Sequence, residues 1–115
     1  MLIKHTTSQI VKLTIASGVS ISVGNAVGIS SGEAVLSDKN AQVSVVGIAK
    51  SVQSGIVYIQ TSGKIANSDS GNDFWLGTNG LLVNNVPTTG MVQYIATRID
   101  AQNILIDIDN TVIFL

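Results

Sequence analysis

The stretch Gly28-Ile29-Ser30-Ser31-Gly32-Glu33-Ala34-Val35 decides the fold, because its pattern returns later in the chain as Leu76-Gly77-Thr78-Asn79-Gly80-Leu81-Leu82-Val83. In each copy two strand-like pieces flank a short polar turn that ends in glycine, and Gly32 and Gly80 lie 48 positions apart. Apolar runs on both sides of a turn of this kind are typical of β-hairpins. The sequence therefore predicts a β structure that is present twice.

The correspondence continues beyond the hairpin. Ile48-Ala49 corresponds to Ile95-Ala96, and Val57-Tyr58-Ile59-Gln60 corresponds to Ile104-Leu105-Ile106-Asp107, each 47 positions later. The order of the pieces is the same in both copies, and no catalytic side chains recur at matching positions. The two copies share strand and turn patterns, which determine how the chain packs. A repeat of this kind favours a scaffold or assembly protein.

The length of 115 residues fits a single domain. A copy of about 47 residues would bury too little surface to be stable alone, so the two copies are expected to share one core. We expect an all-β fold, a small barrel or sandwich built from two pseudo-repeated units. Unit one covers about 26–63 and unit two about 73–110, within a domain 26–115 that follows an N-terminal strand arm at 1–25.

Apolar and polar residues alternate in the arm from Val11 to Ile15 and again from Val19 to Val23, which predicts two half-buried strands there. Asn79-Gly80 is a strong hairpin signal, since both residue types tolerate positive φ. The strands expected in the two units are 26–30, 34–36, 42–49, 56–61, 73–76, 81–83, 91–98 and 103–108.

Charged residues are unusually few. Lys and Arg number 6 and Asp and Glu 7, which is 11% of the chain against about a quarter in soluble domains, while 45% is hydrophobic. The electrostatic repulsion between neighbouring copies of such a surface is weak, which favours self-association. A net charge of −1 provides no basic surface for nucleic acid, and no apolar run is long enough to span a membrane. With no cysteine, disulfides and thiolate metal sites are excluded.

Candidate reactive residues are sparse. Asp107 and Asp109 have a spacing that places both on one face of a strand, with Asp100 close in sequence, but three carboxylates do not complete a calcium shell. We therefore interpret them as solvent-facing strand residues. His5 is the only histidine and lies near the N-terminus, which disfavours a Ser-His-Asp triad. Glu33 is the only glutamate, so a site with two catalytic glutamates is excluded. We expect no catalytic residue, no metal and no cofactor, and a protein that is not an enzyme.

Trp75 is the residue best suited to contact a ligand, because its ring could stack on a sugar or anchor a partner. Its position in the first expected strand of unit two favours packing in the core instead. Both interpretations stay open, with the core favoured.

Two apolar segments are candidate assembly surfaces. The C-terminus ends on apolar residues that would be unfavourable in water unless docked, and the alternating strand of the arm could pair with another chain or complete a sheet edge. The candidate assembly residues are Ile10, Val11, Leu13, Ile15, Val112, Ile113, Phe114 and Leu115.

Four pieces of the chain carry a family resemblance: Gly47-Ile48-Ala49, Gly55 to Gly63, Phe74 to Val83 and Thr89 to Gln93. This series resembles a β-rich module of tailed-bacteriophage virion proteins, among them head-decoration, head-fibre and tail-fibre components. The resemblance covers about residues 26–110 and rests on turn glycines and strand patterns.

The resemblance implies a structural protein of the virion, assembled in the host cytoplasm. Such modules are commonly trimeric and bind other virion proteins, so the implied partners are further copies of the chain and a major capsid or fibre protein. Capsid decoration that bridges shell subunits is the favoured expectation. The alternative is a recognition module at a fibre or tail tip whose polar loops, at 37–40, 67–73 and 84–90, bind a host glycan or protein.

Overall fold

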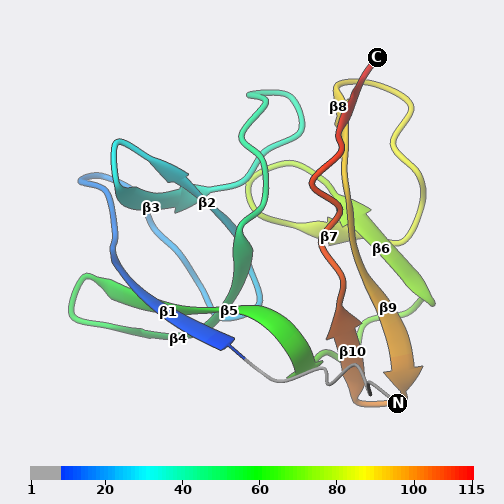
Figure 1. The fold of residues 1–115 in the computed structure, drawn as a ribbon, viewed down its shortest axis with the longest axis horizontal. Coiled ribbons are helices and arrows are strands. Elements are labelled where there is room, and N and C mark those ends of the chain that lie inside the picture. Colours follow the sequence, from blue (N-terminus) through cyan, green and yellow to red (C-terminus); the bar gives the residue numbers. More distant parts are fainter. Residues whose placement is uncertain (1–8) are drawn as a thin grey trace, which may run out of the picture.

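The protein is all-β, as the sequence predicts. The computed structural model describes residues 9–115, and every regular element in that range is a strand (Figure 1). No helix within the described range is long and apolar enough to cross a membrane. The strands are β1 Gln9–Thr14, β2 Ala26–Ser30, β3 Glu33–Leu36, β4 Gly47–Gln53, β5 Ile56–Ala66, β6 Asp73–Leu76, β7 Leu82–Val83, β8 Met91–Val92, β9 Tyr94–Asp100, β10 Asn103–Ile106 and β11 Ile113–Phe114.

The duplication appears directly in the order of the strands. One sheet runs β3-β2-β4-β5-β10-β9-β6-β7, so the order of unit two is that of unit one reversed. The bounds of β4 and β9 lie 47 positions apart, as do the first residues of β5 and β10. The two hairpin turns share a left-handed backbone, with φ of 51° and 79° at Ser31 and Gly32 and of 52° and 75° at Asn79 and Gly80.

Strand β5 joins the two units. Its first part, Ile56 to Gln60, pairs with β4, while its last part, Gly63 to Ala66, pairs with β10 of unit two. Both pairings are antiparallel. The two units therefore lie side by side as one continuous, curled sheet, with β1–β5 on the left of Figure 1 and β6–β10 on the right.

The described part of the arm belongs to this sheet. Strand β1 pairs antiparallel with β5 of its own chain, from Thr14 opposite Ile56 to Gln9 opposite Ser62. The second strand predicted at 19–23 is wrong: this segment lies between turns with positive φ at Gly18 and Gly24 and forms no strand. Val19 and Ile21 pack inward as the alternation predicts, whereas Val23 is 67% exposed.

Two hydrophobic clusters fill the fold. The first lies mainly in unit two and also takes Ala26, Val45 and Ile48 from unit one, which fulfils the expectation of a shared core. The second lies within unit one, and residues of the arm, among them Leu13 and Val19, pack against it. The arm thus covers an apolar face that unit one would otherwise expose to water.

Most of the predicted strands have different bounds. Strand β5 runs on to Ala66, although the sequence predicts its end at 61. Strand β4 starts only at Gly47 because segment 42–46 bends, with φ of 58° at Gln42. The strand predicted at 91–98 is divided at Gln93, whose side chain is buried and hydrogen-bonded. The strand predicted at 103–108 ends at Ile106, where the chain leaves β5, so Asp107 and Asp109 are not strand residues.

The two phenylalanines provide a matched test of this packing. Phe74 is 1% exposed, with the Arg98 guanidinium carbon 5.4 Å from its ring centre, whereas Phe114 is 58% exposed. Phe74→Ala leaves a cavity in the shared core and should lower the free energy of unfolding by about 3–5 kcal/mol. Phe114→Ala, at protein concentrations low enough that the chains do not associate, should change it by less than about 0.5 kcal/mol. Urea denaturation measures both, and equal losses would contradict this assignment of the core.

Candidate functional site

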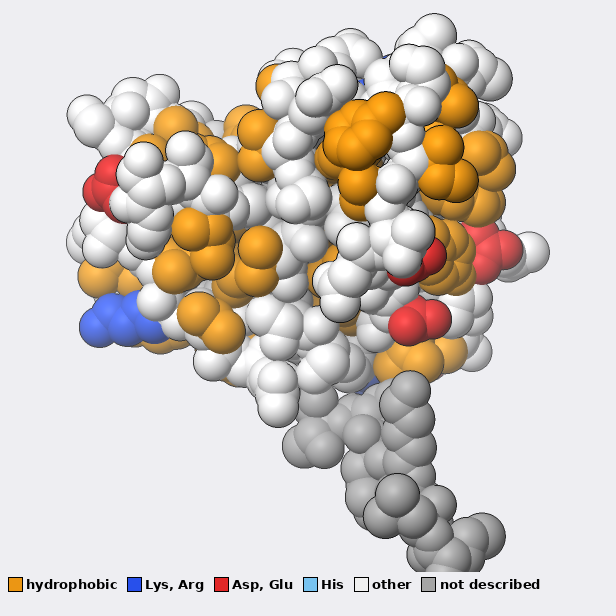
Figure 2. All heavy atoms as spheres, turned by 45° about the horizontal axis from the view of Figure 1, so that its top comes forward, with side chains coloured by type: hydrophobic (Ala, Val, Ile, Leu, Met, Phe, Trp, Pro, Cys, Tyr) orange, Lys and Arg blue, Asp and Glu red, His pale blue; other side chains and the backbone are white. Residues whose placement is uncertain are grey.

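The C-terminal strand is held by its backbone while its side chains face outward. Strand β11 pairs antiparallel with β8, and the Leu115 N–H donates to the Gly90 carbonyl O at 2.9 Å. Ile113, Phe114 and Leu115 are 59%, 58% and 66% exposed. We call these three residues the C-terminal apolar strip. Figure 2, in which the top of Figure 1 is turned forward, shows hydrophobic side chains gathered at this end of the molecule.

The remaining candidate assembly residues divide into two groups. Ile10 and Val11 in β1 are 45% and 39% exposed and extend the apolar surface of the arm. Leu13, Ile15 and Val112 are half-buried and pack against the two hydrophobic clusters. The structure therefore leaves five of the eight residues accessible to a partner and uses the other three inside the fold.

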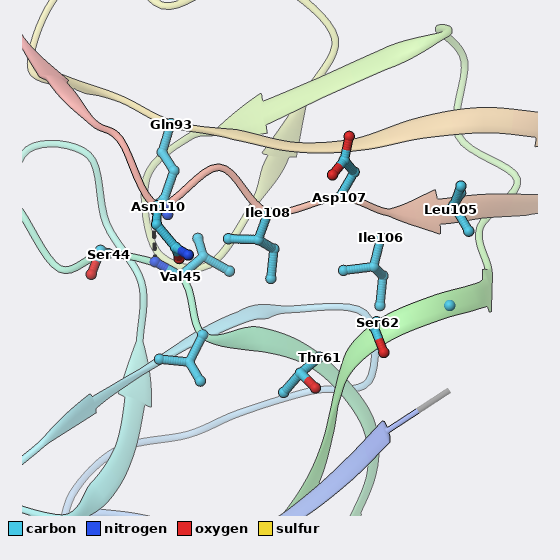
Figure 3. Close-up of a pocket in the computed structure, with 12 residues that line it drawn as sticks. Ser44, Val45, Thr61, Ser62, Gln93, Leu105, Ile106, Asp107, Ile108 and Asn110 are labelled. Carbon is cyan, nitrogen blue, oxygen red and sulfur yellow. Dashed lines mark hydrogen bonds between the residues drawn. The ribbon is translucent and has the colours of Figure 1, made fainter. Parts of the chain in front are cut away.

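A cleft of about 700 Å³ separates the two units where β10 diverges from β5 (Figure 3). Ile106 and Ile108 point into it, and Asp107 points the other way, toward β9. Its walls combine apolar side chains with hydroxyl and amide groups. The lining residues are Ser44, Val45, Val46, Thr61, Ser62, Gly63, Gln93, Leu105, Ile106, Asp107, Ile108 and Asn110.

Gln93 ties the segments around this cleft together. Its side chain is 2% exposed, its Oε1 accepts from the Val45 N–H at 2.8 Å, and its Nε2 donates to the Asp109 carbonyl O at 3.0 Å. One buried amide thus joins unit one to the segment that leads to the C-terminus. Because both of its polar ends are engaged, Gln93 acts as a structural clamp of the cleft.

The polar loops expected to bind a ligand, at 37–40, 67–73 and 84–90, are connected by hydrogen bonds. The Asp38 carboxylate accepts from the Asn79 N–H at 2.9 Å, and this bond, more than any other contact, lowers the pKa of Asp38. Lys39 Nζ donates to the Thr89 carbonyl O at 2.9 Å, and Asn84 Nδ2 donates to the Ser70 carbonyl O at 3.0 Å. Loop 84–90 therefore contacts both of the other loops.

Trp75 does not lie in the core, so the favoured interpretation of this residue is wrong. Its neighbours Phe74 and Leu76 are buried, and strand alternation turns Trp75 to the opposite face, where it is half-buried. There it meets Tyr94 edge to face, with ring centres 5.7 Å apart and planes at 77°. The Tyr94 hydroxyl donates to Asp73 Oδ1 at 2.7 Å. Burial, with this bond, raises the pKa of Tyr94 to about 12.

The acidic residues considered for a metal are not gathered. No group of three metal-ligating side chains occurs among residues 9–115. Asp100 caps the turn before β10, where its carboxylate accepts from the Gln102 N–H at 2.9 Å, and this contact lowers the pKa of Asp100. Asp109 Oδ1 accepts from the Thr111 N–H at 2.9 Å. His5 lies outside the described residues.

Comparison of the chain with protein-family models, with curated proteins and with solved structures gives no match.

The Gln93 clamp can be tested by replacing its amide with an apolar side chain. Gln93→Leu leaves the Val45 N–H and the Asp109 carbonyl without their partner, at a cost of about 1–3 kcal/mol for each group that stays unpaired. We expect a corresponding loss in the free energy of unfolding, measured by urea denaturation. Gln102→Leu, at an exposed turn position, is the control and should leave stability within about 0.5 kcal/mol of wild type. Equal effects would mean that the amide of Gln93 is not a clamp.

Proposed function

We propose that this protein is a non-enzymatic structural component of a tailed-bacteriophage virion that decorates the capsid and stabilises the shell by bridging its subunits. The observation that carries the proposal is the C-terminal apolar strip, since three adjacent large side chains more than half exposed are unfavourable in water. Adjacent exposed apolar side chains of this kind mark interaction surfaces. The resemblance of residues 26–110 to virion modules gives the proposal its biological setting.

The low charge of the chain supports assembly in many copies. With 11% charged residues, neighbouring copies repel each other weakly, and the surface is polar mainly through Ser, Thr, Asn and Gln. A decoration protein binds at many equivalent positions on one particle. Each contact can therefore be modest, because the shell is stabilised by their sum.

The way in which β11 is held suits this role. Its backbone pairing with β8 fixes the strand, so Ile113, Phe114 and Leu115 are presented on an ordered support and bind with little loss of conformational freedom. Strand β1 carries the second accessible apolar pair, Ile10 and Val11, on the other unit of the fold. We propose a homotrimer in which the C-terminal strip closes the contact between copies, and a major capsid or fibre protein as the further partner.

The proposal predicts the mass of the protein in solution. Light scattering of wild type should give about three times the 12.0 kDa of one chain. Phe114→Asp places a charge in the contact and should weaken association at least about 30-fold, as expected for loss of a central anchor. The proposed contact between the trimer and the capsid protein is measured by sedimentation with capsid shells that lack decoration protein. The trimer should sediment with these shells.

Ile99→Asp is the matched control. Ile99 is 47% exposed near the end of β9, which lies at the other end of the molecule from the C-terminus in Figure 1. This variant should remain trimeric. A wild-type protein that is monomeric at all concentrations and is not retained by shells would overturn the proposal, as would equal effects of the two variants.

A further inference from the structure

At corresponding positions of the sheet the two units carry different side chains on the same face. The duplication allows these positions to be compared one by one. In unit two Trp75 of β6 pairs with Tyr94 of β9. In unit one Val27 of β2, 48 positions before Trp75, pairs with Gly47 of β4, 47 positions before Tyr94. The pair of a valine and a glycine in unit one is thus replaced by the two largest aromatic residues of unit two.

Unit one has no room for larger side chains at these positions. A Cβ atom at Gly47 would lie 2.7 Å from the Gln60 carbonyl O. Val27 is fully buried in the second hydrophobic cluster, against which Leu13 and Val19 of the arm pack. The chain itself therefore closes this face in unit one.

In unit two the same face is open. Trp75 and Tyr94 are half-buried, and Asp73 and Asp107 are exposed. Asp107 stands 47 positions after the buried Gln60, and Asp73 stands 48 after the half-buried Asn25. Since unit one forms the same strands without these four side chains, the strand order does not require them.

We propose that this face of unit two binds a neutral, hexose-based glycan, with Trp75 as the stacking platform and the carboxylates of Asp73 and Asp107 as acceptors for sugar hydroxyls. The face comprises Asp73, Trp75, Tyr94, Thr97 and Asp107, and we call it the aromatic face. The inference is independent of the assembly role, because it uses none of the residues of the C-terminal apolar strip.

The geometry of the aromatic face suits a sugar ring. The edge-to-face contact with Tyr94 fixes the Trp75 ring, and an exposed aromatic surface is apolar enough to pack against the C–H groups of a pyranose. The Tyr94 hydroxyl uses one oxygen of Asp73, which orients that carboxylate. Thr97 lies opposite Asp73 in the neighbouring strand and adds a hydroxyl.

Charge selects the class of glycan. The Asp107 N–H donates to the carbonyl O of Ile95, the neighbour of Tyr94, and the Asp107 side chain points toward β9 in Figure 3, so both carboxylates border the aromatic pair. Lys64, opposite Leu105 in the sheet, is the neighbouring cation. Two carboxylates against one lysine disfavour sialylated or phosphorylated ligands, while carboxylates accept strong hydrogen bonds from neutral hydroxyl groups.

The test is an array of neutral, amino and sialylated oligosaccharides probed with the full chain, followed by titration of the strongest neutral ligand. We expect binding to neutral hexose oligosaccharides. Trp75→Ala should weaken it about 30-fold or more, as for loss of an aromatic anchor. Tyr58→Ala, which removes a half-buried aromatic ring from unit one, is the control and should leave the affinity unchanged.

A second variant keeps the test valid if Trp75→Ala fails to fold. Asp107→Ala changes an exposed side chain and should weaken the same ligand about tenfold while thermal unfolding stays as in wild type. Absence of neutral-glycan binding by the folded wild type would overturn the inference, as would binding restricted to sialylated glycans or equal affinities of wild type and the folded variants. Each of these outcomes leaves the trimer and shell measurements unaffected.

Discussion

The pairing of β5 with strands on both sides of the molecule is the constraint on which the rest of the structure depends. Eleven residues long, β5 holds β4 and β1 along its first part and β10 along its last four residues. Without the contact between Gly63–Ala66 and β10, the sheet would separate into two small sheets. Each half would keep at least four strands, but the first hydrophobic cluster takes residues from both units, so separation of the halves would expose apolar faces that they now cover together.

The same strand explains the cleft and the aromatic face. Because β10 leaves β5 after Ile106, the two units diverge and a cleft opens between them, which Gln93 spans with both ends of its amide. In unit one the arm packs against the cluster that holds Val27, while in unit two the corresponding face stays open with Trp75. A duplicated fold has thus become asymmetric, with one copy closed and the other available to bind.

Much of the fold could be predicted from the sequence because strand alternation and turn glycines are local signals. Asn79-Gly80 and Ser31-Gly32 specify their turns directly. The breaks at Gln93 and Asp107 were missed, because they depend on contacts between distant segments that no local pattern encodes. The orientation of Trp75 could be predicted, since Phe74 and Leu76 on both sides of it are apolar and alternate with it. The change from Val27 and Gly47 in unit one to Trp75 and Tyr94 in unit two is also visible in the sequence.

Native-state hydrogen exchange of the full chain tests most directly whether β5 makes the two units one cooperative domain. The account predicts that core amides of β4 and β5 in unit one and of β9 and β10 in unit two open with the same free energy, within about 1 kcal/mol, because no unit unfolds without the other. Opening of one unit at a clearly lower free energy, with full protection retained in the other, would contradict it.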